Sequence, residues 1–273
     1  MPHSMTLPDK LVNTKISGFD FLEISIDETD EKLSRLYWSE HERKILKNAV
    51  IETGVTPGSM CLSGHRKYPL GSMDEKTRKK SFDIMTIAID FASELGIRII
   101  QLAGYDVYYE KSNDKTRSYF QENLAKSVTI AAKNGVYLAF ETMETPFMDT
   151  VEKAMFYINE INSPYLQIYP DLGNLTNAAI LYNHDIKDDI KTGHGHITAM
   201  HLKETAHGKY RDIPYGTGQV DFQSGIEAVW KQGVRRFVGE FWDNGDFQTQ
   251  INHAYTFLSG FLDETEKKEK EKQ

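Results

Sequence analysis

Seven short apolar runs, each followed by a longer amphipathic segment, predict an α/β fold whose parallel strands close into a barrel. Most runs lack strict alternation of polar and apolar residues, which is typical of parallel strands covered on both faces. The runs lie at residues 19–26, 55–63, 97–104, 136–143, 166–172, 197–203 and 237–242. We therefore predict a TIM (β/α)8-type barrel with seven visible strands and its first strand apparently missing.

The helices follow from apolar spacing and from glycine stops. Across 73–95, apolar residues recur at every third or fourth position, and Gly96 then ends the helix. The other helices are expected at residues 40–53, 115–134, 149–162, 178–192, 222–232 and 246–263. A further helix, about 7–17, opens the chain where a barrel would carry its first strand, so the visible strands are expected to be the second to the eighth.

No linker divides the chain, so we expect a single barrel domain over residues 1–263. Residues 264–273, ETEKKEKEKQ, are nearly devoid of apolar side chains. Such a segment cannot bury enough surface to offset its loss of conformational entropy. We expect it to be a charged, disordered tail.

Composition excludes several classes of protein. The 273 residues carry 40 acidic and 32 basic side chains, a formal charge of −8 that argues against a nucleic-acid partner. No run approaches 18 apolar residues, so no membrane span is expected. The N-terminus lacks a secretory pattern and Cys61 is the only cysteine, which together predict a cytoplasmic location. No GxGxxG or P-loop motif is present, so no nucleotide cofactor is expected. Among the classes of protein considered, composition therefore favours an enzyme that acts on a small molecule.

Polar residues end the predicted strands, where a barrel of this type places its chemistry. The strand ends carry Glu23, Ser63, Gln101, Glu141, Asp171, His201 and Glu240. The last four come from four successive strands, and buried carboxylates that converge need a cation or a proton between them. Three carboxylates and one imidazole suit one divalent metal ion, Mn²⁺, Mg²⁺ or Zn²⁺. The alternative is that each residue caps a helix or pairs with an arginine.

Several longer strings resemble a known family. They are DETDEKLSRL (27–36), MCLSGHRKYPLGS (60–72), QLAGYDVYY (101–109), YPDLGNL (169–175), HLKET (201–205) and PYGTGQVDF (214–222). Over residues 18–262 the chain resembles the L-ribulose-5-phosphate (L-xylulose-5-phosphate) 3-epimerases of the xylose-isomerase-like barrel superfamily. The resemblance implies that one metal is held by Glu141, Asp171, His201 and Glu240. Family members normally carry the first strand, so its absence here leaves barrel closure open.

The same resemblance implies epimerisation at C3 of a ketopentose 5-phosphate. Inversion next to a ketone removes a proton from one face of the carbon and delivers one to the other, through an enediolate that positive charge stabilises. Glu141 and Glu240 are the expected proton-transfer residues, since their strands lie well apart around the ring. The sequence does not decide which of them removes the proton.

A sugar phosphate needs cations and hydrogen-bonding groups around this centre. Lys203 and Arg211 belong to the basic loop after the seventh strand, and His65 belongs to the cluster His65-Arg66-Lys67 after the third. Asn174 and Gln101 could reach sugar hydroxyls. Glu23 could orient the substrate or a metal ligand. We predict these six as substrate contacts: His65, Lys203, Asn174, Gln101, Glu23 and Arg211. The alternatives are solvated surface loops and local caps.

Three other functions compete with the epimerase. An aldose–ketose isomerase, such as a hexulose-6-phosphate isomerase, would transfer hydride and retain a C3 label that an epimerase exchanges with solvent. An abasic-site DNA endonuclease would use several metals and a basic groove, which the charge of −8 opposes. A non-catalytic sugar-phosphate-binding protein is the third. A homodimer is compatible with the superfamily, although the sequence shows no interface pattern.

Overall fold

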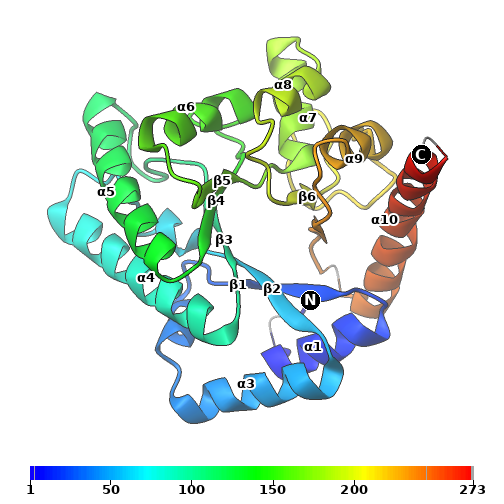
Figure 1. Cartoon of the computed structure of the whole chain (residues 1–273), viewed down its shortest axis with the longest axis horizontal. Coiled ribbons are helices and arrows are strands. Elements are labelled where there is room, and N and C mark those ends of the chain that lie inside the picture. Colours follow the sequence, from blue (N-terminus) through cyan, green and yellow to red (C-terminus); the bar gives the residue numbers. More distant parts are fainter. Residues whose placement is uncertain (3, 244, 272–273) are drawn as a thin grey trace.

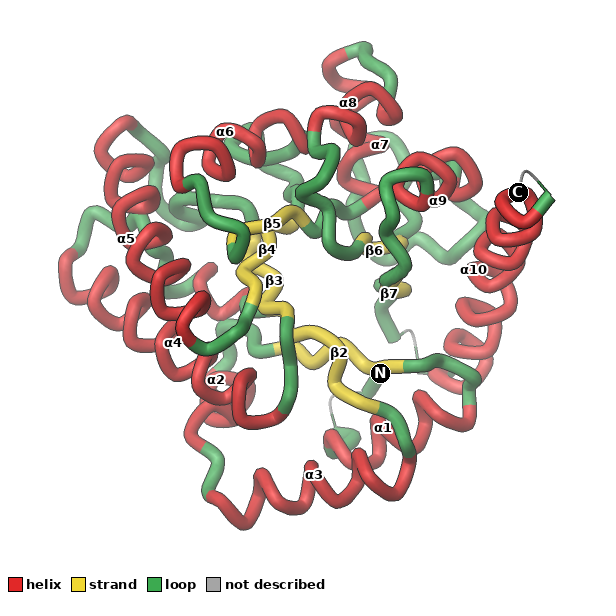
Figure 2. The backbone as a smooth tube through the Cα atoms, in the orientation of Figure 1, coloured by secondary structure: helices red, strands yellow, loops and turns green. Residues whose placement is uncertain are grey.

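The computed structural model describes residues 1–2, 4–243 and 245–271 of the chain. Its strands form an inner ring and its helices an outer layer (Figures 1 and 2). The strands are β1 (Phe21–Ser25), β2 (Thr56–Cys61), β3 (Ile99–Ala103), β4 (Tyr137–Glu141), β5 (Leu166–Ile168), β6 (Met200–Leu202) and β7 (Phe237–Gly239). The predicted TIM-type barrel with seven visible strands is confirmed within these described ranges.

The strands follow one another around the ring in chain order. β1 to β5 form one parallel sheet and β6 pairs with β7 in a second. Parallel bridges from Ile168 to Ile197 and from Asp171 to His201 link the two sheets. No strand pairing joins β7 to β1 among the described residues, which is where the missing first strand would lie. Across this boundary the guanidinium of Arg236 lies 5.0 Å from the Phe21 ring centroid, so side chains form part of the connection.

The outer layer consists of α-helices and two short 3-10 turns. They are α1 (Leu7–Ile16), α2 (Asp30–Ser34), η1 (Arg35–Tyr37), α3 (Glu40–Thr53), η2 (Ser63–Arg66), α4 (Glu75–Leu95), α5 (Asp114–Lys133), α6 (Val151–Ile161), α7 (Leu172–Tyr182), α8 (Ile186–Thr192), α9 (Phe222–Trp230) and α10 (Phe247–Lys270). The helix predicted at 178–192 is in fact two helices. Asn183 adopts φ 52° and ends α7, and the Asp185 side chain then caps α8.

Buried apolar side chains lie on both sides of the strands. The larger cluster fills the space between the strands and the helices and includes residues from Leu7 to Leu258. A smaller cluster lies among β3, β4, β5 and the approach to β6 and consists of Ile99, Ala139, Tyr169 and Ala199. Ala139 lies two residues before Glu141, and Ala199 lies two residues before His201. Because side chains two residues apart in a strand point to the same face, that face carries packed apolar side chains first and a polar side chain at the carboxyl end.

The predicted disordered tail is wrong for residues 264–270, which continue α10 as a regular helix. Thr265 is 4% exposed and its hydroxyl accepts a hydrogen bond from Gln223 of α9. Lys268 lies 2.9 Å from Glu227, also of α9, and Glu269 accepts a hydrogen bond from the Trp230 indole. Polar contacts to a neighbouring helix therefore order a segment that has almost no apolar side chains. Residues 272–273 lie outside the described residues.

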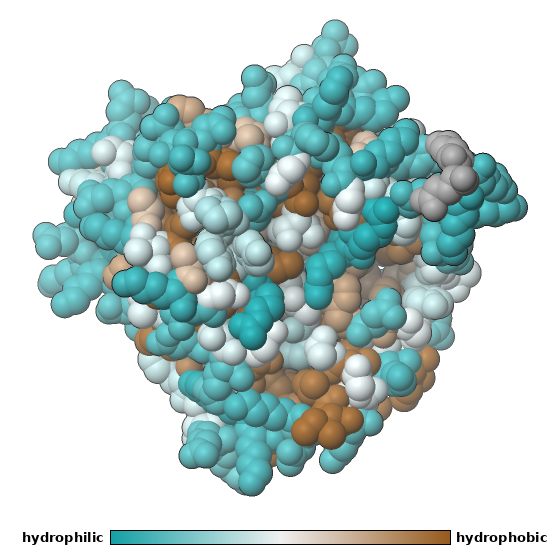
Figure 3. All heavy atoms as spheres, viewed as in Figure 1, coloured by the Kyte–Doolittle hydropathy of each residue, from teal (hydrophilic) through white to brown (hydrophobic). Residues whose placement is uncertain are grey.

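The surface view shows hydrophilic side chains over most of the periphery of this face, with apolar side chains gathered towards its centre and lower edge (Figure 3). Each helix of the described chain is too short or too polar to cross a membrane.

Candidate metal centre

The register of neighbouring strands brings four polar side chains together. Glu141 ends β4, and the next residue, Thr142, accepts a hydrogen bond from the Asp171 backbone N–H at 3.0 Å. Asp171 forms a parallel bridge with His201 of β6. The backbone N–H of Glu240, directly after β7, donates to the Leu202 carbonyl at 3.0 Å. Strand pairing, together with one hydrogen bond to the Thr142 side-chain hydroxyl, thus aligns residues that are far apart in sequence.

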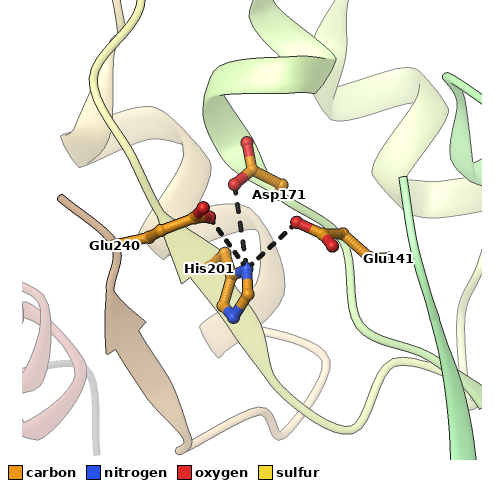
Figure 4. Close-up of side chains that lie close together, drawn as sticks. All are labelled: Glu141, Asp171, His201 and Glu240. Atoms are coloured by element: carbon orange, nitrogen blue, oxygen red, sulfur yellow. Dashed lines mark hydrogen bonds and ion pairs between the residues drawn. The ribbon is translucent and has the colours of Figure 1, made fainter. Parts of the chain in front are cut away.

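Figure 4 shows the side chains of Glu141, Asp171 and Glu240 pointing towards the His201 ring. Nδ1 of His201 lies 3.3 Å from Glu141 Oε1, 3.2 Å from Glu240 Oε2 and 3.8 Å from Asp171 Oδ2. One ligand atom from each of the four residues lies within 4.8 Å of the others. Asp171 is fully buried and the Glu240 side chain is 30% exposed, so the centre opens on one side. The structure therefore brings together all four residues that the sequence singled out.

Charge in this centre is dense and only partly balanced. Lys203 Nζ lies 3.2 Å from Asp171 Oδ2 and 3.8 Å from Glu240 Oε2. Burial, opposed by the Lys203 charge, raises the pKa of Asp171 to about 7. Desolvation acts to raise the pKa of Glu240, but the Lys203 charge and the His201 hydrogen bond hold that pKa well below its usual range. Burial would lower the pKa of His201, yet the Glu23 charge and hydrogen bonds to carboxylates raise it.

The donor set fits a divalent ion. Asp171 Oδ2 and Glu240 Oε2 are buried, and each lies 3.2 Å from one donor nitrogen, Lys203 Nζ and His201 Nδ1 respectively. With Glu141 beside them, three carboxylates share these two donors, and a buried excess of negative charge is costly unless a cation or a proton balances it. Carboxylate oxygens with one imidazole nitrogen match the preferences of Mn²⁺, Mg²⁺ or Zn²⁺. The part of the chain that the structure describes contains no second cluster of this kind.

Glu23 lies behind His201 and fixes its orientation. Its Oε1 is 2.7 Å from His201 Nε2, and its Oε2 accepts a hydrogen bond from the Ser59 hydroxyl at 2.6 Å. A carboxylate in this position holds the Nε2 proton and leaves Nδ1 to face the acidic side chains. Of the two roles predicted for Glu23, the geometry favours orientation of a metal ligand over direct contact with the substrate.

Two predicted substrate contacts lie near the centre. Gln101 is fully buried, forms register pairs with Cys61 and Ala139, and has an amide group without a hydrogen-bond partner among the described residues. Asn174 donates from its backbone to Asp171 Oδ1 at 2.7 Å and from its side chain to the Thr142 carbonyl at 2.7 Å. Gln101 therefore has unused hydrogen-bonding capacity. Asn174 supports Asp171 directly, and its side-chain oxygen also lacks a hydrogen-bond partner among the described residues.

Of the remaining predicted contacts, His65 lies in an apolar packing environment, whereas Arg211 lies on the predicted loop. Nε2 of His65 lies 3.2 Å from the Ser81 carbonyl of α4, and burial lowers the pKa of His65 to about 4. A neutral ring that packs against α4 does not supply the cation expected for a phosphate. The structure thus gives His65 a packing role. Arg211 lies on the loop after β6, where its guanidinium is 2.6 Å from Glu144.

Sequence reasoning missed Glu204, which follows Lys203 directly. Glu204 is 3% exposed, and its carboxylate accepts hydrogen bonds from the backbone N–H groups of Thr205, Gly216 and Val220. Its position directly after a strand-end lysine was the available signal. Glu204 organises the loop after β6, whose Tyr215 hydroxyl has one proton for two nearby backbone carbonyls, that of Leu202 at 2.5 Å and that of Glu240 at 3.2 Å.

A ring of parallel strands with an acidic, histidine-containing centre at its carboxyl ends defines a TIM-barrel enzyme. Comparison with known proteins gives the family. The chain belongs to the xylose isomerase-like TIM barrel family, whose model matches residues 13–258, and within it to the L-ribulose-5-phosphate 3-epimerases. The predicted resemblance and the isomerase class of enzyme are both confirmed.

The relatives behind this assignment are bacterial. The chain is 46% identical over 225 residues to L-ribulose-5-phosphate 3-epimerases of Shigella boydii serotype 18 and Escherichia coli O157:H7, matching 82% of this chain and 78% of each relative. Among solved structures, a 3-keto-D-glucoside 4-epimerase from E. coli superposes with a TM-score of 0.76 at 18% identity, covering 95% of both chains. An L-ribulose 3-epimerase superposes with a TM-score of 0.75 at 20% identity, covering 97% of this chain and 91% of that one. These two likenesses establish the fold.

Proposed function

We propose that this protein is a metal-dependent epimerase that inverts C3 of a ketopentose 5-phosphate and interconverts L-ribulose 5-phosphate and L-xylulose 5-phosphate. The observation that carries the proposal is the convergence of Glu141, Asp171, His201 and Glu240 on one centre, in a chain 46% identical to enzymes named for this reaction. Because C3 lies next to the ketone, its inversion requires only proton transfer and no hydride carrier, so the proposed reaction uses no nucleotide cofactor.

Those four residues would hold one Mn²⁺, Mg²⁺ or Zn²⁺ ion, which supplies positive charge beside the ketone oxygen and so makes the proton on C3 more acidic. Glu141 and Glu240 come from β4 and β7, with β5 and β6 between them. Both carboxylates lie close to His201 Nδ1. One glutamate removes the C3 proton and the other delivers a proton to the opposite face, with the enediolate between the two steps. The roles exchange in the reverse direction.

The remaining contacts follow from chemistry near the centre. The Lys203 ammonium can donate to a substrate oxygen while it remains paired with Asp171. The unpartnered Gln101 amide suits a sugar hydroxyl. Asn174 and Glu23 would act through the ligands that they support, and Arg211 would act at the phosphate. We include a cytoplasmic location in the proposal because phosphorylated sugars are intracellular metabolites and Cys61 is the only cysteine.

Proton exchange tests the reaction. The purified chain with Mn²⁺ is incubated with L-xylulose 5-phosphate in D₂O and followed by NMR. We expect deuterium at C3 together with formation of L-ribulose 5-phosphate. Glu141→Gln and Glu240→Gln should each abolish exchange, whereas Glu160→Gln, on the surface helix α6, should not. An aldose product that retains the C3 proton would favour the isomerase instead, and near-normal turnover by both variants would refute the two-glutamate mechanism.

Metal binding has a separate readout that needs no substrate. An ion that binds only the folded state raises the free energy of unfolding. Once its concentration exceeds Kd, this gain grows with the logarithm of the ratio of concentration to Kd. Adding Mn²⁺ should therefore raise the Tm of the wild-type chain, measured by calorimetry. Asp171→Asn should remove most of that rise. An equal rise in both proteins would mean that the ion binds elsewhere.

A further inference from the structure

Tyr169, which follows β5 directly, has a large and fully buried side chain. It belongs to the smaller apolar cluster, together with Ala139 of β4 and Ala199, which lies just before β6. Its backbone N–H donates to the Phe140 carbonyl at 2.7 Å and so anchors the residue to β4. Two small neighbours leave space for a ring that extends from β5 into the interior. The mechanism proposed above gives this residue no role.

The Tyr169 ring packs against the imidazole of His201. The two ring centroids are 4.8 Å apart, and the ring planes are inclined by 59°. Hydrogen bonds at the two nitrogens fix where an imidazole points, whereas an aromatic neighbour limits its rotation and tilting. A metal ion must lie close to the imidazole plane to share the nitrogen lone pair. The contact with Tyr169 therefore affects the geometry with which His201 can bind an ion.

The hydroxyl end of Tyr169 lies beside Glu23, the carboxylate that contacts His201 Nε2. The hydroxyl is close enough to Glu23 and Ser59 to interact with both. The Ser59 hydroxyl already donates to Glu23 Oε2 at 2.6 Å. The Tyr169 hydroxyl is buried and has no hydrogen-bond partner among the described residues. A buried donor without an acceptor is costly, and a carboxylate accepts more than two hydrogen bonds, so Glu23 has capacity for this second hydroxyl.

Tyr169 thus connects distant parts of the ring of strands. Glu23 and Ser59 belong to β1 and β2, whereas Tyr169 follows β5 and His201 belongs to β6. Along the sheet, the strand pairs that lead from β1 to β5 pass through β2, β3 and β4. No pairing joins β1 to β7 within the described ranges. The Tyr169 side chain therefore provides a direct link between β1 and the part of the ring that carries His201.

We propose that Tyr169 is a positioning residue of the metal centre: its ring fixes the plane of the His201 imidazole, and its hydroxyl acts with Ser59 as a second donor to Glu23. A small movement of the phenol towards Glu23 completes the hydrogen bond that the buried hydroxyl lacks. A carboxylate held by two donors keeps its contact with Nε2, and an imidazole held by an aromatic neighbour keeps Nδ1 aimed at the acidic side chains. This inference rests on the proposed function, because it concerns a ligand of the metal ion proposed there.

The first test measures Mn²⁺ affinity by calorimetric titration of Tyr169→Phe, Tyr169→Leu and Tyr165→Phe. Tyr165 lies directly before β5 and stacks on Tyr137 with 5.3 Å between the ring centroids, which makes it a matched control at the other end of the strand. Tyr169→Phe removes one hydrogen bond and should weaken binding by about 3- to 10-fold. Tyr169→Leu also removes the ring and should weaken binding by about 10- to 100-fold. Tyr165→Phe should bind as wild type does.

A double-mutant cycle distinguishes positioning from general packing. If the Tyr169 hydroxyl acts through Glu23, Tyr169→Phe should weaken Mn²⁺ binding much less in a Glu23→Gln background than in the wild-type background. A loss that results only from disturbed packing should be the same in both backgrounds. Equal losses in the two backgrounds would overturn the role of the hydroxyl. Should Tyr169→Leu fail to fold, this cycle still decides the proposal.

A further measurement needs neither metal nor substrate. In ¹⁵N-histidine-labelled protein, NMR measures how fast the Nε2 proton of His201 exchanges with water, with the signal assigned by its loss in His201→Gln. Exchange should be up to about 10-fold faster in Tyr169→Phe than in wild type or Tyr165→Phe, because the contact with Glu23 is then less well held. If wild type binds no Mn²⁺, the proposed metal centre fails, while this measurement still tests Tyr169. Unchanged exchange and unchanged Mn²⁺ affinity in the Tyr169 variants would overturn the inference.

Discussion

Nε2 of His201 lies 2.7 Å from Oε1 of Glu23, on the side of the imidazole ring opposite the nitrogen that faces Glu141, Asp171 and Glu240. The two residues are 178 positions apart in the chain. Glu23 belongs to β1, the strand that borders the missing position of the ring. The strand at the unpaired edge of the described ring therefore contributes to the centre, through the orientation of one predicted ligand.

The first prediction concerns this contact. Glu23→Gln removes the charge that holds the Nε2 proton, so His201 should become a weaker and less well oriented ligand. Loss of such a carboxylate typically lowers metal affinity by about 10- to 100-fold. Calorimetric titration with Mn²⁺ measures the change, with the exposed Glu31→Gln as the control. Equal Mn²⁺ affinity in Glu23→Gln and wild type would show that Glu23 only packs against the ring.

Strand-end reasoning predicted the centre because barrel geometry converts sequence position into spatial position. Asp171 and His201 form a parallel bridge, so an acid and an imidazole after successive strands had to meet. The seven strands could be predicted for a related reason, since each is an apolar run of suitable length. Neither prediction required knowledge of a loop conformation.

Residues outside that regular framework were harder to predict. His65 and Arg66 are adjacent in a basic cluster, yet His65 packs against α4 and Arg66 lies over the Tyr108 ring of the loop after β3. The backbone conformation of η2 determines which of the two side chains packs against a helix and which faces a loop. Likewise, Thr265 and Lys268 lie in a segment without an apolar pattern, and their contacts with α9 depend on where α10 runs. Local composition carries no information about such tertiary contacts.

The second prediction concerns the acid stability of the fold. The folded-state pKa of His65, lowered by burial to about 4, lies below the unfolded value of 6.5. As the pH falls from 6.5 to 4, unfolded chains bind a proton at His65 that folded chains do not, so stability is lost across this window. The loss amounts to about 3 kcal/mol below pH 4. Free energies of unfolding in urea, measured from pH 7.5 to 4, should fall less steeply for His65→Gln than for wild type. Parallel pH profiles would mean that His65 is protonated equally in both states.

The third prediction concerns the end of α10. Glu269 accepts a hydrogen bond from the Trp230 indole and lies 3.1 Å from a terminal nitrogen of Arg235. Glu269→Ala should lower the free energy of unfolding by about 1 kcal/mol, because it leaves the indole N–H without its partner. Glu266→Ala removes only an exposed ion pair with Lys270 and should change stability by less than about 0.5 kcal/mol. Equal effects of the two substitutions would mean that the last turns of α10 do not pack on α9 in solution.

The last prediction concerns Glu204 and the loop that it holds. Two backbone N–H groups, of Thr205 and Val220, donate to its Oε1 at 3.1 Å, and that of Gly216 donates to its Oε2 at 3.0 Å. Glu204→Gln puts an amide NH₂ in place of one of these oxygens, so at least one buried N–H loses its acceptor. An unsatisfied buried donor costs about 1–3 kcal/mol. Denaturant unfolding should show a loss of that size, and hydrogen exchange at Gly216 and Val220 should accelerate.

Greater mobility of this loop should also disturb the position of Glu240 in the metal centre, because the Tyr215 hydroxyl lies 3.2 Å from the Glu240 backbone carbonyl oxygen. Gly218→Ala provides an independent perturbation of the same loop. A Cβ at Gly218 would lie 2.2 Å from the Thr205 carbonyl oxygen and 2.4 Å from Glu204 Oε1, so the backbone must move. Both substitutions should weaken Mn²⁺ binding although neither residue is a predicted ligand. If Glu204→Gln loosens the loop by hydrogen exchange but leaves Mn²⁺ affinity unchanged, then β7 positions Glu240 without help from Tyr215.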